Sequence, residues 1–194
     1  TPTDMPASQY RLFCTLYLVI GTSAFFLGGT VKWMKFQNKV KFTYRLAWER
    51  GTGPCGYGCS ETDIGKTGNS SLSMLRDLHW NCSFGCSTLP VKIGGINYTL
   101  TSVSRNSNGW EQGEGFFMYE LKDYGPYSII LDNIPWTPNN GSATPSLGMM
   151  QTVVDLSTRG DTGKPNGSPY ASLPSVIGYC VSKQAPHLNA RTAS

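Results

Sequence analysis

The clearest alternation of apolar and polar residues runs from position 39 to position 48. Every second residue is large and apolar: Val40, Phe42, Tyr44, Leu46 and Trp48. Lys39, Lys41, Thr43 and Arg45 alternate with the first four of them. A period of two predicts a β-strand with one buried face. The segment VKWMKF at 31–36 ends two residues earlier, so Gln37-Asn38 predicts a tight hairpin between two strands.

Further strand-like segments follow at intervals of about ten residues. Residues 91–93 and 96–104 flank Gly94-Gly95 and predict a second hairpin. Residues 116–121, 127–131 and 149–156 predict three more strands, whereas 72–80 fits a short helix or a strand, and three prolines exclude 161–175 from a central sheet. This spacing predicts an all-β fold, an antiparallel immunoglobulin-like β-sandwich with disulfide-stapled loops, although the Cys…Trp…Cys hallmark of true immunoglobulin domains is absent.

A second pattern is the absence of charge between Arg11 and Lys32, over twenty mostly apolar positions. Such a run can span a bilayer as a helix. Its basic residue, apolar stretch and small residues also match a secretory signal over 5–24. Its β-branched and aromatic residues fit a strand that needs a partner. A strand-rich domain behind it makes the spanning helix the least favoured, which leaves a cleaved signal peptide or a retained strand.

Three parts are expected along the chain: an apolar segment at 1–24, a β-sandwich domain at 25–182 and a polar tail at 183–194. A retained apolar segment must bury its side chains, because each is worth about 1.5–3 kcal/mol when fully buried. It can do so by adding a strand to a neighbouring subunit, which repeated head to tail gives a filament. The strand-donor candidates are Leu12, Phe13, Leu16, Leu18, Ile20 and Phe25.

The six cysteines form two C-x3-C motifs and two isolated positions, and all are disulfide candidates: Cys55, Cys59, Cys82, Cys86, Cys14 and Cys180. Structural zinc sites permit this spacing, but the abundance of N-x-S/T motifs favours disulfides. A bridge within C-x3-C is awkward in extended chain. Bridges between the two motifs are therefore expected, each closing about thirty residues and contributing about 2–4 kcal/mol.

The abundance of N-x-S/T motifs points to a secretory route. Five of the eleven asparagines begin such a motif, where the Ser and Thr content predicts about two. The resulting glycosylation candidates are Asn69, Asn81, Asn97, Asn140 and Asn166. Charged residues make up only 14% of the chain and the net charge is +4. The lysines at 32, 35, 39 and 41 are predicted to form a solvated sheet face, not a nucleic-acid site.

Catalytic chemistry has little support in the sequence. No G-x-S-x-G, H-E-x-x-H, phosphate-loop or dinucleotide motif occurs, so we predict no enzyme activity, no cofactor and no metal site. Glu111 and Glu114 are predicted to lie in a solvated loop that enters a strand. Arg159-Gly160-Asp161 matches the short integrin-binding signal, but we expect an ion pair or turn that holds this segment against the sandwich.

Three segments together resemble a known family: LGGTVKWMKF, KVKFTYRLAWERG and TVVDLSTRGDTGKPNGSPYASLPSVI. The family is an uncharacterised extracellular domain of secreted proteins from aquatic animals and other eukaryotes, and the resemblance covers roughly residues 26–181. Its members often carry Ser where Gly160 stands, which further discounts the integrin signal. The family has no established activity, so the resemblance implies secretion and a sandwich fold and no mechanism.

These observations lead to two functional expectations. The first is a secreted structural subunit that builds an extracellular fibre by donating its N-terminal strand to a neighbour's sandwich. The second is a secreted monomeric adhesion or binding domain whose residues 5–24 are a cleaved signal peptide. Self-association and attached glycans are the expected partners; nucleic acid and a membrane are not.

Overall fold

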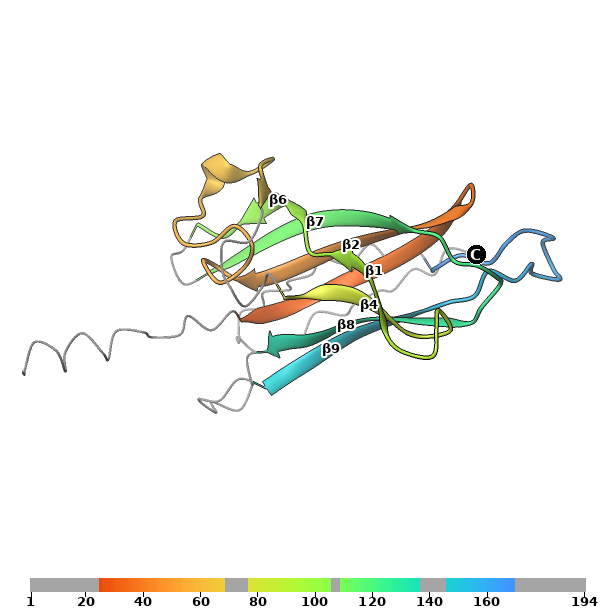
Figure 1. Ribbon diagram of the computed structural model, residues 1–194. Helices are drawn as coiled ribbons and strands as arrows, with labels where there is room; N and C mark the ends of the chain where they lie inside the picture. The colour runs from red at the N-terminus through yellow and green to blue at the C-terminus, as the bar shows by residue number, and fades with distance from the viewer. Residues whose placement is uncertain (1–24, 69–76, 106–108, 137–145, 170–194) are drawn as a thin grey trace, which may run out of the picture.

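The computed structural model describes residues 25–68, 77–105, 109–136 and 146–169 (Figure 1). These residues form β-strands and one short 3-10 turn, η1 at Glu61–Asp63. The strands are β1 (Phe26–Phe36), β2 (Lys39–Glu49), β3 (Thr67–Gly68), β4 (His79–Phe84), β5 (Val91–Gly95), β6 (Tyr98–Val103), β7 (Trp110–Tyr119), β8 (Tyr127–Trp136) and β9 (Ser146–Val154). The all-β prediction is confirmed. None of the described segments makes a helix of the length and apolarity that crossing a membrane requires.

The strands form one sheet that curls over on itself. Its order is β3-β6-β7-β2-β1-β8-β4-β5, with β9 on β8. Every pairing is antiparallel except that of β1 with β8, where the register gives a single parallel pair, Phe26 with Trp136. Because one residue pair joins the halves, the β7-β2-β1 half turns over the β4-β8-β9 half (Figure 1).

The core lies between the two halves. The apolar set predicted for β2 is buried, with exposures of 0–1%. Trp80 on β4 reaches across to Tyr44 on β2 and Phe117 on β7, with ring centroids 5.6 and 5.9 Å apart. Aromatic side chains remove about 150–250 Å² each from water, so these rings dominate the attraction between the halves.

The first predicted hairpin is confirmed. β1 and β2 pair from Phe26–Trp48 to Phe36–Lys39, in one register from Gly28 onward and with an irregularity between Phe26 and Gly28. The turn places Gln37 at φ 56°, in the left-handed region, where glycine is the usual residue. The long ladder that follows offsets this local cost.

The second predicted hairpin is wrong. β5 pairs with β4 and β6 pairs with β7, so the chain crosses from one half to the other after Gly95. Tyr44 fixes this crossing, because its hydroxyl accepts a hydrogen bond from Asn97 N at 2.9 Å and donates one to Asn97 O at 2.7 Å. A Cβ on Gly94 would lie 2.6 Å from the ring of Phe117. The glycine therefore makes room for a core ring and does not mark a hairpin turn.

Candidate functional site

The most unusual place in the fold is the seam between β1 and β9. Among the described residues β9 forms a ladder with β8 alone, and it contacts β1 through a side chain. Trp33 on β1 donates its indole N–H to the carbonyl of Val153, at 2.9 Å, and Ser168 N donates to Trp33 O at 3.3 Å. Over the described residues, these two strands are therefore not joined by a ladder of backbone hydrogen bonds. The Trp33 side chain connects β1 to β9, and Ser168 connects β1 to the loop after β9.

The edge of β9 lacks the usual protection against pairing with another chain. Its sequence, SLGMMQTVV, has neither charge nor proline, and Leu147, Met149 and Val153 are 68, 57 and 57% exposed. Edge strands commonly carry lysine or proline or are short, because their unpaired backbone groups accept a further strand. Backbone direction alternates along a strand, so the groups of Gln151 and Met149 face the same edge as the Val153 carbonyl. β9 therefore combines an uncharged, proline-free sequence with exposed apolar side chains on its outer side, and its Val153 carbonyl is bonded to Trp33.

A cavity of 790 Å³ lies at the C-terminal end of this seam. Its walls come from the two strands and from the loop that follows β9: Trp33, Gln151, Val153, Arg159, Asn166 and Ser168.

The same loop carries the Arg-Gly-Asp sequence. Arg159 and Asp161 form a two-pronged ion pair, with Nε–Oδ1 at 3.0 Å and Nη2–Oδ2 at 2.6 Å, and Arg159 lowers the pKa of Asp161. The predicted ion pair is confirmed. It is exposed at the loop tip, however, so the anchoring role expected for it is wrong. The loop is held by backbone bonds of Leu156 to Tyr124 and of Ser168 to Trp33.

Two disulfides form within the C-x3-C motifs, Cys55–Cys59 and Cys82–Cys86. The expected bridges between the motifs are wrong. The chain is not extended at either site, because Gly56, Gly58 and Gly85 have φ of 77, 85 and 92° and fold it back. The Cα atoms of each pair come to 5.5 and 6.0 Å, within the ordinary disulfide range. Cys14 and Cys180 lie outside the described residues.

Glu111, predicted to be solvated, is instead wholly buried at the start of β7. Its Oε1 accepts hydrogen bonds from Tyr98 Oη at 2.8 Å and Cys55 N at 3.1 Å, and its Oε2 accepts one from Gly51 N at 3.1 Å. Burial raises the pKa of Glu111 and also that of Tyr98. The carboxylate therefore ties the loop at 50–59 to the sheet.

The surroundings of Glu111 explain why sequence reasoning missed it. A Cβ on Gly53 would lie 2.2 Å from Oε1, so the loop approaches this closely only because it has no side chain there. Glycines in the loop opposite an isolated acid are the only sequence signal. The Cys55 and Cys59 sulfurs lie within 4.8 Å of a carboxylate oxygen of Glu111. Because the two sulfurs are bonded to each other in a disulfide, neither is a thiolate that could bind a metal ion.

Glu114 lies three residues further along β7 and has a different role. It is half-exposed on the outer side of the sheet, where its Oε1 accepts a hydrogen bond from Arg45 Nε at 2.7 Å. The two predicted acids are therefore not a functional pair: one is buried and the other forms a cross-strand ion pair. The loop predicted around them is the first half of a strand.

The glycosylation candidates differ in access. Asn97 is exposed at the crossing between β5 and β6. Asn81 is half-buried on β4, where its Nδ2 donates to Asp132 Oδ1 at 3.1 Å. Asn166 is half-buried and its Oδ1 accepts from Gly167 N at 3.0 Å. Asn69 and Asn140 lie outside the described residues, so Asn97 is the best-placed acceptor among those described.

Of the strand-donor candidates, Leu12, Phe13, Leu16, Leu18 and Ile20 lie outside the described residues. Phe25 is described and lies directly before β1, where its backbone bonds to β2 and to the loop after it. Its N donates to Thr52 Oγ1 at 3.0 Å, and its O accepts from Glu49 N at 2.8 Å. Phe25 is therefore removed from the set of candidates, and a donated segment must end before it.

Comparison of the chain with protein-family models, with curated proteins and with solved structures finds no match in any of the three.

Proposed function

We propose that the protein is a secreted structural subunit that assembles into an extracellular fibre. The apolar segment before Phe25 of one copy adds as a strand to the β9 edge of the next copy. The observation that carries this proposal is that β9 has no charge and no proline, pairs among the described residues with β8 alone, and exposes Leu147, Met149 and Val153 on its outer side. Strand addition supplies main-chain hydrogen bonds for affinity and side-chain contacts for specificity.

The geometry of such a contact favours a fibre over a closed ring or dimer. The donated segment lies at the N-terminus, whereas the receiving edge is near the other end of the described chain, so the two surfaces differ. A contact between unlike surfaces is head-to-tail, and it continues indefinitely unless its rotation closes.

Further features of the chain support an extracellular setting for this subunit. Two disulfides are typical of an oxidising compartment. The same proposal holds that the protein is secreted, that Asn97 carries a glycan and that the chain is related to the extracellular domain family which it resembles. We also propose an immunoglobulin-like sandwich as the class of the curled sheet, because its halves pack face to face through Tyr44, Trp80 and Phe117.

The proposal is tested by removing each side of the contact separately. Deletion of residues 5–24 is expected to leave monomers, and so is Met149→Lys, which places a charge on the receiving edge. Met118→Lys makes the same change on the outer side of β7 and is expected to leave assembly intact. Electron microscopy and light scattering after size-exclusion chromatography measure the outcome.

Two results would overturn the fibre. One is filaments that form without residues 5–24 or in Met149→Lys. The other is a secreted native chain whose N-terminal sequencing begins near Phe25, which favours the monomeric adhesion or binding domain with a cleaved signal peptide.

A further inference from the structure

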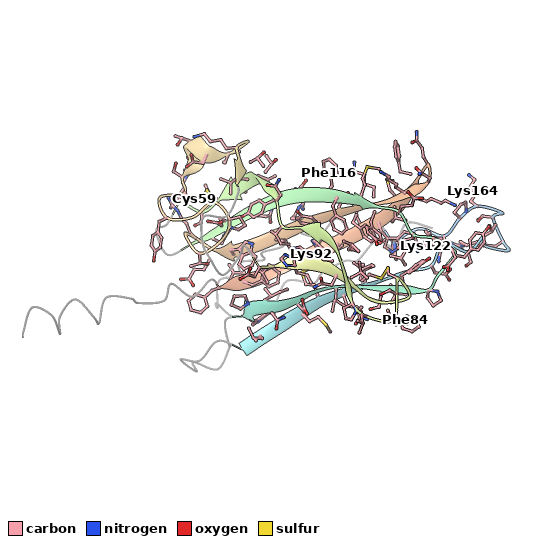
Figure 2. All side chains as sticks on the ribbon, viewed as in Figure 1. Cys59, Phe84, Lys92, Phe116, Lys122 and Lys164 are labelled. Carbon is pink, nitrogen blue, oxygen red and sulfur yellow. A yellow bond between two sulfur atoms is a disulfide. The ribbon has the colours of Figure 1, made fainter. Side chains whose placement is uncertain are left out.

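The outer side of β1, β2 and β7 combines positive charge with exposed apolar side chains; we call it the basic face. The register places Met34 and Met118 on either side of Lys41, and Phe36 beside Lys39. Phe116 stands beside Thr43 in the next row and is 61% exposed, and Met34 and Phe36 are 57 and 51% exposed. Figure 2 shows Phe116 on the upper side of the molecule, away from Phe84 on the lower side.

The charge of the basic face is one-sided. Its outward positions carry Lys32, Lys39, Lys41 and Arg45. The acids on this side are Glu114, which pairs with Arg45, and Glu49 at the opposite end of β2 from Lys39 and Lys41; the exposed Glu120 directly follows β7. Lys41 Nζ lies 4.7 Å from the centre of the Phe116 ring, a cation–π contact on the outer side of the sheet. Neither Lys39 nor Lys41 forms a salt bridge within the described residues. The face therefore attracts an anion and offers apolar surface between its charges.

The compartment in which the protein lies limits which negatively charged partner can meet the basic face. The two disulfides indicate an oxidising environment, whereas anionic lipids concentrate in the cytoplasmic leaflet of membranes. An acidic polysaccharide meets both demands of the surface, because its sulfates or carboxylates pair with ammonium groups and the C–H faces of its sugar rings pack on Phe and Met. We propose that the basic face binds an acidic polysaccharide. This proposal is independent of fibre assembly.

Heparin serves as the probe, with the full chain immobilised and binding measured between 50 and 300 mM NaCl. The double variant Lys39→Gln/Lys41→Gln is expected to weaken binding roughly tenfold and to reduce its salt dependence. The control Lys92→Gln/Lys164→Gln removes the same charge from exposed lysines elsewhere and is expected to bind as the unaltered chain does. Thermal unfolding by circular dichroism verifies that both variants are folded.

A second pair of variants tests whether the apolar side chains of the basic face contribute to binding in addition to its charge. Phe116→Ala is expected to weaken heparin binding several-fold, whereas Phe84→Ala, which removes a ring that is 64% exposed on the opposite half, is expected to leave it unchanged. Equal losses in the control lysine variant would overturn the proposal, since net charge would then explain binding. Retention on phosphatidylserine vesicles or on single-stranded DNA with no binding to heparin would also overturn it, in favour of a lipid or nucleic-acid surface.

Discussion

Glu111 is the single side chain on which the loop at 50–59 depends most. Its carboxylate is enclosed by Tyr98, Cys55 and Gly51, which donate the three hydrogen bonds that compensate for its removal from water. Burial is the larger influence, so the pKa of Glu111 is raised above its ordinary value. A buried acid that is held more readily in its neutral form makes the stability of the fold depend on pH.

The pH dependence has a definite sign. Between the ordinary pKa and the raised folded pKa of Glu111, the native state binds more protons than the unfolded state, so its contribution to stability falls as pH rises. Glu111→Gln is expected to remove this slope. It also places an amide N–H₂ toward a backbone N–H, at a cost of about 1–3 kcal/mol. Urea unfolding from pH 4 to pH 8 measures both effects.

Glu114→Gln is the control for this experiment. Its ion pair with Arg45 is half-exposed, and such pairs contribute about 0–1 kcal/mol. An unchanged pH slope in Glu111→Gln, or the same change of slope in both variants, would contradict the role given to Glu111.

Among the elements, the two C-x3-C segments act as independent staples. Each disulfide closes a short loop of its own, so neither ties one motif to the other. Loss of Cys82–Cys86 by a double change to Ser is expected to cost about 2 kcal/mol, as the entropy of a short closed loop predicts. Chemical unfolding of the variant measures the cost.

The connectivity itself is checked by digestion with trypsin under non-reducing conditions. Cleavage after Lys66 and Arg76 separates the two motifs. Internal bridges leave the peptides 51–66 and 77–92 unlinked. A disulfide-linked pair of these peptides would contradict the structure.

The strand pairings differed in whether they could be predicted from the sequence. The β1–β2 hairpin was predictable because an alternating pattern and a two-residue gap are local signals. β5 and β6 are neighbours along the chain and were predicted to pair, yet they lie in different halves. The deciding contacts, of Tyr44 with Asn97 and of Phe117 with Gly94, join residues far apart in sequence.

On the scale of the whole molecule, tertiary structure decides which N-x-S/T motif is reachable. Asn97 is exposed at the crossing between the halves, whereas the amide of Asn81 is bonded to Asp132. Expression in a glycosylating eukaryotic cell is therefore expected to modify Asn97. Asn97→Gln should increase the electrophoretic mobility of the chain by one glycan, and Asn81→Gln should leave it unchanged. A mobility shift in Asn81→Gln alone would contradict this assignment.

By itself, the sequence determined the all-β class, the buried face of β2, the first hairpin and the ion pair of Arg159 with Asp161. Each of these depends on residues close together along the chain. Tertiary structure alone decided the disulfide pairing, the burial of Glu111, the crossing after β5 and the place of β9 beside β8 at the end of the described sheet. The alternating pattern of a strand predicts which of its side chains are buried, but it does not predict which strand lies beside it. Which strand lies at the edge of a sheet is therefore decided only when the sheet is assembled.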